Sequence, residues 1–373
     1  MNTLKTFFKN ETVFVISFIC AVVSMIIVPP NSNYLGYVNV SVLIMLFCLM
    51  LVVAGFNSIG MFNLISKKLL SKTSDTKVIS LILVNMCYVL SMFITNDVAL
   101  ITLVPLTLNI LKSCDIKTNI KVVTMETVSA NLGSMVTPIG NPQNIFIYEH
   151  YGLSIQDFFK IMLPLGLLSL IVINLILIVS KSEKISFSSN SNSIKLDTKP
   201  LIFYSIMFLI CILTVLKIIS HVICLLSILV LALIVNPKIV SKVDYILLLT
   251  FVSFFIFVGN IGSIELVHTF ISKVLQGREV IISVILSQII SNVPATLMLS
   301  SFTNNFKLLL VGVNLGGLGT LIGSLDSFIS FKFFSKEYPK YISRYIRSFS
   351  VYNFLILALL LMVFYTTNIY WLK

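Results

Sequence analysis

Apolar residues run along this chain in long blocks that short polar segments separate. Because about 20 apolar residues span the hydrocarbon core of a bilayer, such blocks predict transmembrane helices. A shorter segment, 263–275, has the pattern of an amphipathic helix at the membrane interface. We expect apolar helices at 12–29, 37–65, 78–94, 98–111, 119–148, 158–180, 201–217, 221–235, 244–262, 280–291, 293–302, 307–331 and 348–371.

Two neighbouring blocks, 78–94 and 98–111, are too short to cross the membrane and meet at the polar tripeptide Thr95–Asp97. At 1.5 Å per residue, each arm covers only about 21–25 Å. Lysine-rich loops precede the first arm and follow the second, and such loops are typical of the cytoplasmic side. The sequence therefore predicts a re-entrant hairpin at 78–111, which protein or a water-filled cavity must surround.

The same pattern recurs at 280–302, where two short arms meet at Ser291 and Asn292. By the positive-inside rule, this second hairpin enters the membrane from the opposite side. The same rule places the N-terminus, with Lys5 and Lys9, in the cytoplasm. The expected parts are a first repeat at 1–180, a cytoplasmic linker and connecting helix at 181–220, and an inverted second repeat at 221–373.

A second internal repeat lies in the blocks 119–148 and 307–331. Six of ten positions are identical when residues 131–140 are aligned with 314–323, without gaps. Inverted repeats with interrupted helices are typical of secondary transporters that bind substrate at the repeat interface. The sequence thus predicts an all-α polytopic membrane protein with two inverted repeats, each holding a re-entrant hairpin and a broken transmembrane helix.

Glycine and proline interrupt these two helices and free backbone groups at membrane depth. Freed N–H groups at a helix N-terminus favour anions, and freed carbonyls at a C-terminus favour cations. The expected helix-breaking residues are Pro138, Gly140, Pro142, Gly317, Gly319 and Gly323. The candidate substrate-binding residues are Asn96, Thr137, Asn141, Asn292, Thr320 and Ser324. The candidate coupling-ion residues are Thr95, Asn96, Asp97, Asn131, Gly133, Ser291, Asn292, Asn314 and Gly316.

Composition supports a membrane protein, because 57% of the residues are hydrophobic and only 11% are charged. The net charge of +12 reflects lysines in loops, so no nucleic-acid partner is expected. The six cysteines are scattered and are interpreted as packing residues. No metalloprotease or Ser–His motif indicates an enzyme, and no metal or cofactor is expected beyond H⁺ or Na⁺ as the coupling ion.

Two acidic residues outside the hairpin tips leave alternatives open. Glu126 lies within a predicted helix and is equally consistent with a proton relay and an ion pair. Asp326 is expected to end the second broken helix near the cytoplasm, as a boundary residue.

The segments "TNDVALITLVPL", "NLGSMVTPIGNPQN", "SNVPA" and "VNLGGLGTLIGS" resemble the ion transporter superfamily of arsenite pumps, sodium–proton antiporters and citrate or divalent-anion symporters. The resemblance is closest to the anion permease, citrate-transporter-like branch. In the dicarboxylate branch each tip reads Ser-Asn-Thr, and Asn96 and Asn292 match the substrate-binding Asn. The third position of each tip differs from this pattern: it is Asp97 in the first tip and Val293 in the second. The resemblance also implies a homodimer in which a transport unit moves against a scaffold.

These features predict a secondary active transporter in the cytoplasmic membrane, moving a small carboxylate or an oxyanion such as arsenite with H⁺ or Na⁺. An ionised Asp97 would repel a dianion unless a proton or cation neutralised it. A sodium–proton antiporter is therefore the alternative transporter, with Asp97 exchanging the two ions. An ion channel is the alternative from another class, and it predicts flux that runs only downhill.

Overall fold

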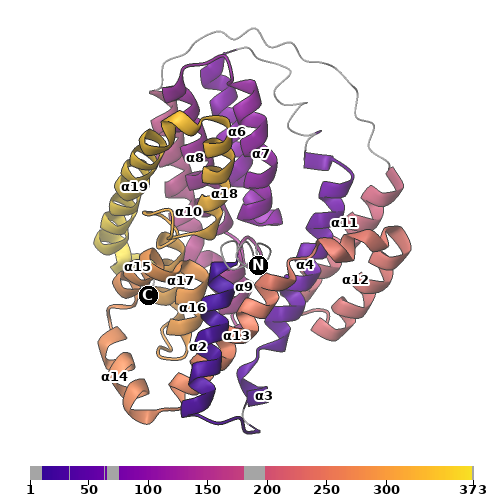
Figure 1. Cartoon of the computed structure of the whole chain (residues 1–373), viewed down its shortest axis with the longest axis vertical. Helices are drawn as coiled ribbons and strands as arrows, with labels where there is room; N and C mark the ends of the chain where they lie inside the picture. Colours follow the sequence, from indigo (N-terminus) through magenta and orange to yellow (C-terminus); the bar gives the residue numbers. More distant parts are fainter. Residues whose placement is uncertain (1–10, 33, 63, 65–74, 180–197, 372–373) are drawn as a thin grey trace, which may run out of the picture.

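The computed structural model describes residues 11–32, 34–62, 64, 75–179 and 198–371 (Figure 1). These residues fold into helices, and no strand occurs within the described ranges. The expectation of an all-α protein is confirmed. The elements are α2 (Thr12–Ile27), α3 (Tyr34–Tyr37), α4 (Val40–Ser58), α6 (Thr76–Ile94), α7 (Asn96–Ile110), α8 (Ile116–Ser134), α9 (Pro142–His150), α10 (Ile155–Ile178), α11 (Thr198–Val215), α12 (His221–Val235), the 3₁₀ turn η1 (Pro237–Lys242), α13 (Tyr245–Gly262), α14 (Glu265–Leu275), α15 (Glu279–Ile290), α16 (Asn292–Ser300), α17 (Phe306–Leu315), α18 (Leu325–Glu337), the 3₁₀ turn η2 (Pro339–Tyr341) and α19 (Ile342–Trp371).

Within the described ranges, six helical segments are long and apolar enough to cross a membrane. They are α4, α6, α10, α11, α13 and the stretch formed by η2 and α19. Shorter apolar helices, among them α7, α15 and α17, lie between them in sequence. Large apolar side chains such as Leu167, Ile171 and Leu175 remain exposed along one face of α10. These features fit a polytopic membrane protein whose outer faces contact lipid.

The predicted helix positions agree closely with the observed ones. Helix α12 occupies the predicted range, 221–235. One clear difference is in α19, which begins at Ile342 although apolarity alone predicted 348. Arg344 and Arg347 lower the hydropathy of this first turn without interrupting the helix, and the buried Tyr345 holds it against the core.

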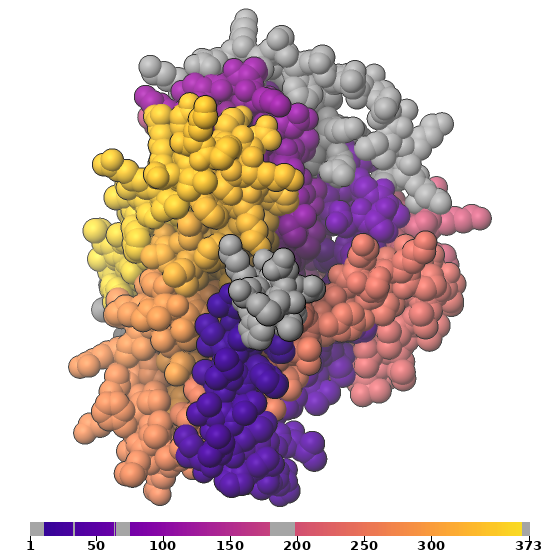
Figure 2. Space-filling model, viewed as in Figure 1, coloured from indigo at the N-terminus to yellow at the C-terminus, as the bar shows by residue number. Residues whose placement is uncertain are grey.

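The helices pack in groups that bring distant parts of the chain together (Figure 1). One group contains α6, α7, α8 and α10, and α18 and α19 from the end of the chain pack against it. Helices α15, α16 and α17 pack together, and so do α4, α11 and α12. In Figure 2 the N-terminal helix α2, in indigo, lies on the visible surface, and it packs along α13. Asn260 of α13 donates a hydrogen bond to Ser24 of α2 at 2.9 Å.

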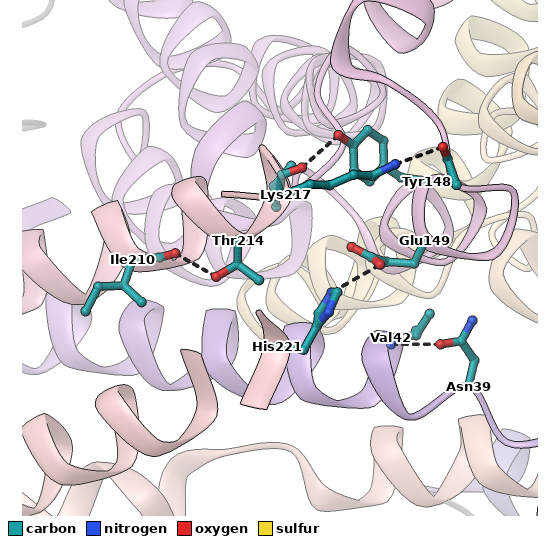
Figure 3. Close-up of polar contacts among 10 residues, drawn as sticks. Asn39, Val42, Tyr148, Glu149, Ile210, Thr214, Lys217 and His221 are labelled. Atoms are coloured by element: carbon teal, nitrogen blue, oxygen red, sulfur yellow. Dashed lines mark hydrogen bonds and ion pairs between the residues drawn. The ribbon is translucent and has the colours of Figure 1, made fainter. Parts of the chain in front are cut away.

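The end of the short helix α9 is held by the turn between α11 and α12 (Figure 3). The Tyr148 hydroxyl donates to a carbonyl at the end of α11 at 2.7 Å. Lys217 Nζ donates to the Gly152 carbonyl at 2.8 Å, and His221 Nε2 lies 3.1 Å from the Glu149 carboxylate. We call Tyr148, Glu149, Lys217 and His221 the α9 clamp. It fixes the helix whose other end enters the polar centre described below.

Candidate functional site

The two predicted hairpin tips have the same backbone conformation. Thr95 separates α6 from α7 with φ 74° and ψ 150°, and Ser291 separates α15 from α16 with φ 76° and ψ 156°. Residues with a side chain rarely adopt this region, at a cost of about 1–3 kcal/mol each. The neighbouring Asn96 and Asn292 are both buried. Two segments far apart in the sequence therefore form the same strained turn.

Both predicted helix interruptions are present. Helix α8 ends at Ser134 and α9 begins at Pro142, while α17 ends at Leu315 and α18 begins at Leu325. Pro142 stands at the first position of α9, where proline needs no backbone donor. The remaining predicted helix breakers, Pro138, Gly140, Gly317, Gly319 and Gly323, lie in the two non-helical stretches 135–141 and 316–324.

Gly133 and Gly316 allow each broken helix to approach its hairpin closely. A Cβ atom on Gly133 would lie 2.5 Å from Ser91 Oγ, one turn before the first tip. A Cβ atom on Gly316 would likewise lie 2.5 Å from Ser287 Oγ, one turn before the second tip. Both distances are well inside van der Waals contact, so only glycine fits. The two glycines thus allow each broken helix to pack closely against its hairpin.

A buried polar cluster joins the first hairpin tip to the second broken helix. The Asn96 amide donates to the Asp326 carboxylate, and the Ser324 hydroxyl donates to the same oxygen at 2.8 Å. Ser324 also lies 3.0 Å from Asn131 Oδ1, and Asn96 Nδ2 lies 3.4 Å from that atom. We call Asn96, Asn131, Ser324 and Asp326 the Asp326 network. Asp97, which accepts a hydrogen bond from Thr95, is close enough to Asp326 for their charges to interact.

A second cluster joins the first broken helix to α17 and contains no acid. Asn141 Nδ2 donates to Asn314 Oδ1 at 3.1 Å and to Ser134 Oγ at 3.1 Å. Asn314 Nδ2 in turn donates to Asn144 Oδ1 at 2.7 Å. Asn141 also caps α9 by accepting from the Asn144 backbone N–H at 2.9 Å. We call Ser134, Asn141, Asn144 and Asn314 the asparagine network.

Each network contains an equivalent asparagine contact. Asn131 and Asn314 occupy equivalent positions in the sequence alignment, and so do Asn141 and Ser324. Asn131 contacts Ser324, and Asn314 contacts Asn141. Each asparagine therefore pairs with the residue that begins the second half of the other broken helix.

Asn292 and Gln288 hold the second interruption in place. The Asn292 backbone N–H donates to the Gly323 carbonyl at 3.0 Å. Gln288 Nε2 donates to the carbonyls of Gly316 and Leu318, both at 2.9 Å, and its Oε1 accepts from the Thr320 N–H at 2.8 Å. A single glutamine side chain thus satisfies three backbone groups that the broken helix frees.

Not every predicted site residue joins the two networks. The Thr137 hydroxyl donates a hydrogen bond to the carbonyl of Met92, which lies in α6 shortly before the first tip. The Thr320 hydroxyl accepts from the Gly323 N–H at 3.2 Å within its own loop. Thr95 and Ser291 form the two turns with their backbones, and the Thr95 hydroxyl also donates to Asp97. The structure gathers Asn96, Asn131, Asn141, Asn314 and Ser324 most closely.

The expectation for Asp326 is wrong. Asp326 lies in the first turn of α18, directly after the interruption, and its carboxylate contacts Asn96. Gln288 was not singled out by the sequence at all. The internal repeat could have identified Asp326 as a site residue, because Asp326 aligns with Gln143 in the polar segment of the first interruption.

Helix ends divide the polar centre into two electrostatically different parts. The N-termini of α7 and α18 pack together and carry Asp97 and Asp326 in their first turns. Helices α9 and α16 also pack together, but neither first turn contains an acid. Each N-terminus carries a partial positive charge from the helix dipole. The first part therefore suits a cation, and the second suits an anion.

A family model and several known proteins match this chain. A family model described as citrate transporter matches residues 7–308. The uncharacterized transporter MJ0456 of Methanocaldococcus jannaschii is 34% identical over 292 residues, which cover 77% of this chain and 79% of that protein. The inner membrane protein YbiR of Escherichia coli is 32% identical over 289 residues, which cover 76% of this chain and 77% of that protein. The putative transporter arsB of Dictyostelium discoideum is 30% identical over 158 residues, or 42% of this chain and 27% of that protein.

The apolar helices, the buried polar centre and these relatives define a polytopic membrane transporter. The chain belongs to the citrate transporter family, whose model covers most of its length. The resemblance to the anion permeases that the sequence motifs indicated is thereby confirmed.

Proposed function

We propose that this protein is a secondary active transporter that moves a small carboxylate or oxyanion across the cytoplasmic membrane, coupled to H⁺ or Na⁺. The observation that carries the proposal is the contact of Asn96 with Asp326, which brings the first hairpin tip against the second broken helix. A buried site made by two interrupted segments is typical of secondary transporters. The Escherichia coli relative is named an inner membrane protein, which supports the location.

The proposal includes an inverted repeat, with repeats at 1–180 and 221–373 and re-entrant hairpins at 78–111 and 280–302. The matching dihedral angles of Thr95 and Ser291 support it. So do the duplicated contacts of Asn131 with Ser324 and of Asn314 with Asn141. The cytoplasmic N-terminus and the linker at 181–197 belong to the same proposal but lie outside the described residues.

We assign the two parts of the polar centre to the two transported species. Asp97, Asn96, Asn131 and Asp326 bind the coupling cation, because two neighbouring carboxylates attract positive charge. The ends of α9 and α16, with Asn141 and Asn292, bind the anion through amide groups and helix dipoles. This division answers the difficulty that Asp97 poses for an anionic substrate, since the bound cation neutralises the carboxylates.

We further propose that transport follows the elevator mechanism that the family resemblance implies, within a homodimer. The unit that contains α6, α7, α8 and α18 moves relative to α4, α11 and α12. The separate packing of these two groups supports this choice.

Flux measurements with purified protein in proteoliposomes test the function. Citrate, succinate, arsenite, sulfate and phosphate are offered in turn, each with an imposed pH or Na⁺ gradient. We expect accumulation of one anion above its equilibrium level, driven by one gradient. Protein-free vesicles are the control, and flux that only runs downhill would indicate a channel.

Sodium–proton antiport is the second candidate, and the neighbouring Asp97 and Asp326 favour it. Two carboxylates that alternate between H⁺ and Na⁺ need no anion at all. In the same vesicles, Na⁺-driven proton movement that no added anion changes would establish antiport and exclude the first proposal.

A further inference from the structure

Glu126 is a buried acid of α8 that the proposed transport site does not use. Its Oε1 accepts a hydrogen bond from the Thr107 hydroxyl of α7, whereas its Oε2 has no hydrogen-bond partner. Among the described residues no lysine, arginine or histidine forms an ion pair with it. A buried carboxylate charge without a partner is strongly unfavourable, so this carboxyl binds a cation readily, and a proton is the smallest. The sequence left two roles open for Glu126, a proton relay and an ion pair. The described residues do not provide the ion pair.

The surroundings of Glu126 are polar but uncharged. The titratable groups that face it are Cys87 of α6 and Tyr345 of α19, and both side chains are neutral near pH 7. The Thr107 hydroxyl can donate to a carboxylate and can accept from a protonated carboxyl. The contact with Thr107 therefore survives both protonation states.

Glu126 lies about one helical turn from the Asp326 network. Its neighbour Thr127 donates to Ser330 Oγ of α18 at 2.7 Å. Thr127 precedes Asn131 by four residues, so these two positions are about 6 Å apart along α8 at 1.5 Å per residue. Along α8 this hydroxyl pair lies at a position between Glu126 and Asn131.

We propose that Glu126 is a proton-binding site distinct from the Asp326 network. One carboxylate oxygen takes a proton from water to form an O–H bond and returns it to water later in the transport cycle. This inference rests on the proposed function, because it assigns a further proton to the same cycle.

Infrared difference spectroscopy on the purified full-length protein tests the site without any substrate. Titration of pH should produce a carbonyl band of a protonated carboxyl that is missing from Glu126→Gln. The control is Glu337→Gln, which removes an exposed acid paired with Lys112 at 3.5 Å and should leave the band in place. If Glu126→Gln does not fold, Thr107→Val should shift the same band by removing its hydrogen-bond donor. A band that neither variant changes would overturn the inference.

Transport stoichiometry gives the second measurement. In proteoliposomes with an imposed pH gradient, Glu126→Gln should move one proton fewer per substrate than the unchanged protein. An equal ratio would contradict the role of Glu126 in the cycle. If the unchanged protein transports none of the tested anions but Glu126→Gln still lacks the band, the proposed function fails and the proton site stands.

Discussion

Asp326 gives the polar centre a negative charge at a place where the other interruption has a neutral Gln143. The two networks share their asparagine contacts, so this acid is the main chemical difference between them. The two networks have equivalent asparagine contacts, but only one of them carries a negative charge. Such a centre can bind a cation and an anion side by side. At the scale of single residues, the function therefore depends on Asp326 and on the amide that contacts it.

Replacing Asn96 by alanine removes the amide donor to Asp326. A hydrogen bond to a charged group contributes about 1.5–3 kcal/mol, so affinity for the coupling cation should fall roughly 10- to 150-fold at about 1.4 kcal/mol per factor of ten. Cation titrations of transport rate in proteoliposomes measure this change.

The matched control for that variant is Asn85→Ala. Asn85 also pairs with a second amide, Asn174, at 2.8 Å, but between α6 and α10 and away from the polar centre. Its loss should leave the cation titration unchanged. Equal effects of the two variants would show that Asn96 acts only through folding.

Asp326→Asn keeps the shape of the side chain but cannot release a proton or carry a negative charge. Transport by this variant should lose its dependence on the driving cation, seen as a flat pH or Na⁺ profile. Asp157→Asn, which changes an exposed acid at the start of α10, should keep the original profile. An unaltered profile in Asp326→Asn would remove this residue from the coupling site.

At the scale of helices, close packing at Gly133 sets the distance between the first hairpin and the first broken helix. In Gly133→Ala the new Cβ would lie 2.8 Å from Tyr88 Cα, which is backbone and cannot rotate away. Overpacking of this kind costs about 1–3 kcal/mol. Thermal unfolding in detergent should show the loss, together with reduced transport.

Gly36→Ala is the corresponding control, because no atom lies within 4 Å of a Cβ placed there. Its effect on stability should stay within about 0.5 kcal/mol, as is usual for surface positions. A stability loss as large as that of Gly133→Ala would point to a general helix effect instead of a clash.

Helices were the most predictable feature of this chain, for a physical reason. Membrane helices satisfy their own backbone groups, so their positions follow from local apolarity. The predicted 78–94 and the observed Thr76–Ile94 differ only at the first turn, where the polar Thr76 and Lys77 follow the capping residue Asp75. Prolines and glycines likewise predicted the positions of both interruptions, because these residues break helices wherever they cluster.

At the scale of the whole molecule, the α9 clamp connects the polar centre to α11 and α12. If transport moves α9 relative to these helices, a covalent link at the clamp should stop it. In a background without the native cysteines, Glu149→Cys with His221→Cys is treated with a short bifunctional thiol reagent. We expect flux to fall to background and to return when the link is cleaved.

The same reagent applied to Asn85→Cys with Asn174→Cys links α6 to α10, which pack within one group. This control should retain transport. Undiminished flux through the linked clamp would show that α9 and α12 move together, and α9 would then belong with α4, α11 and α12.

Contacts between distant residues were the least predictable feature. Asn96 and Asp326 are 230 positions apart, and no local pattern in one sequence relates them. The internal repeat did point to Asn131, Asn141, Asn314 and Ser324, because repetition identifies equivalent positions within one chain. It could not point to Gln288, whose three contacts with the broken backbone depend on how α15 packs against α17.

The pairing of Asn131 with Ser324 also sets a requirement on synthesis. The two residues are 193 positions apart, so at roughly 5–20 residues per second the ribosome needs roughly 10–40 s to supply the partner. During that interval Asn131 and Asn141 can contact only residues of the first half, such as Asn96 and Ser134. Both networks are therefore completed only after most of the chain has been synthesised.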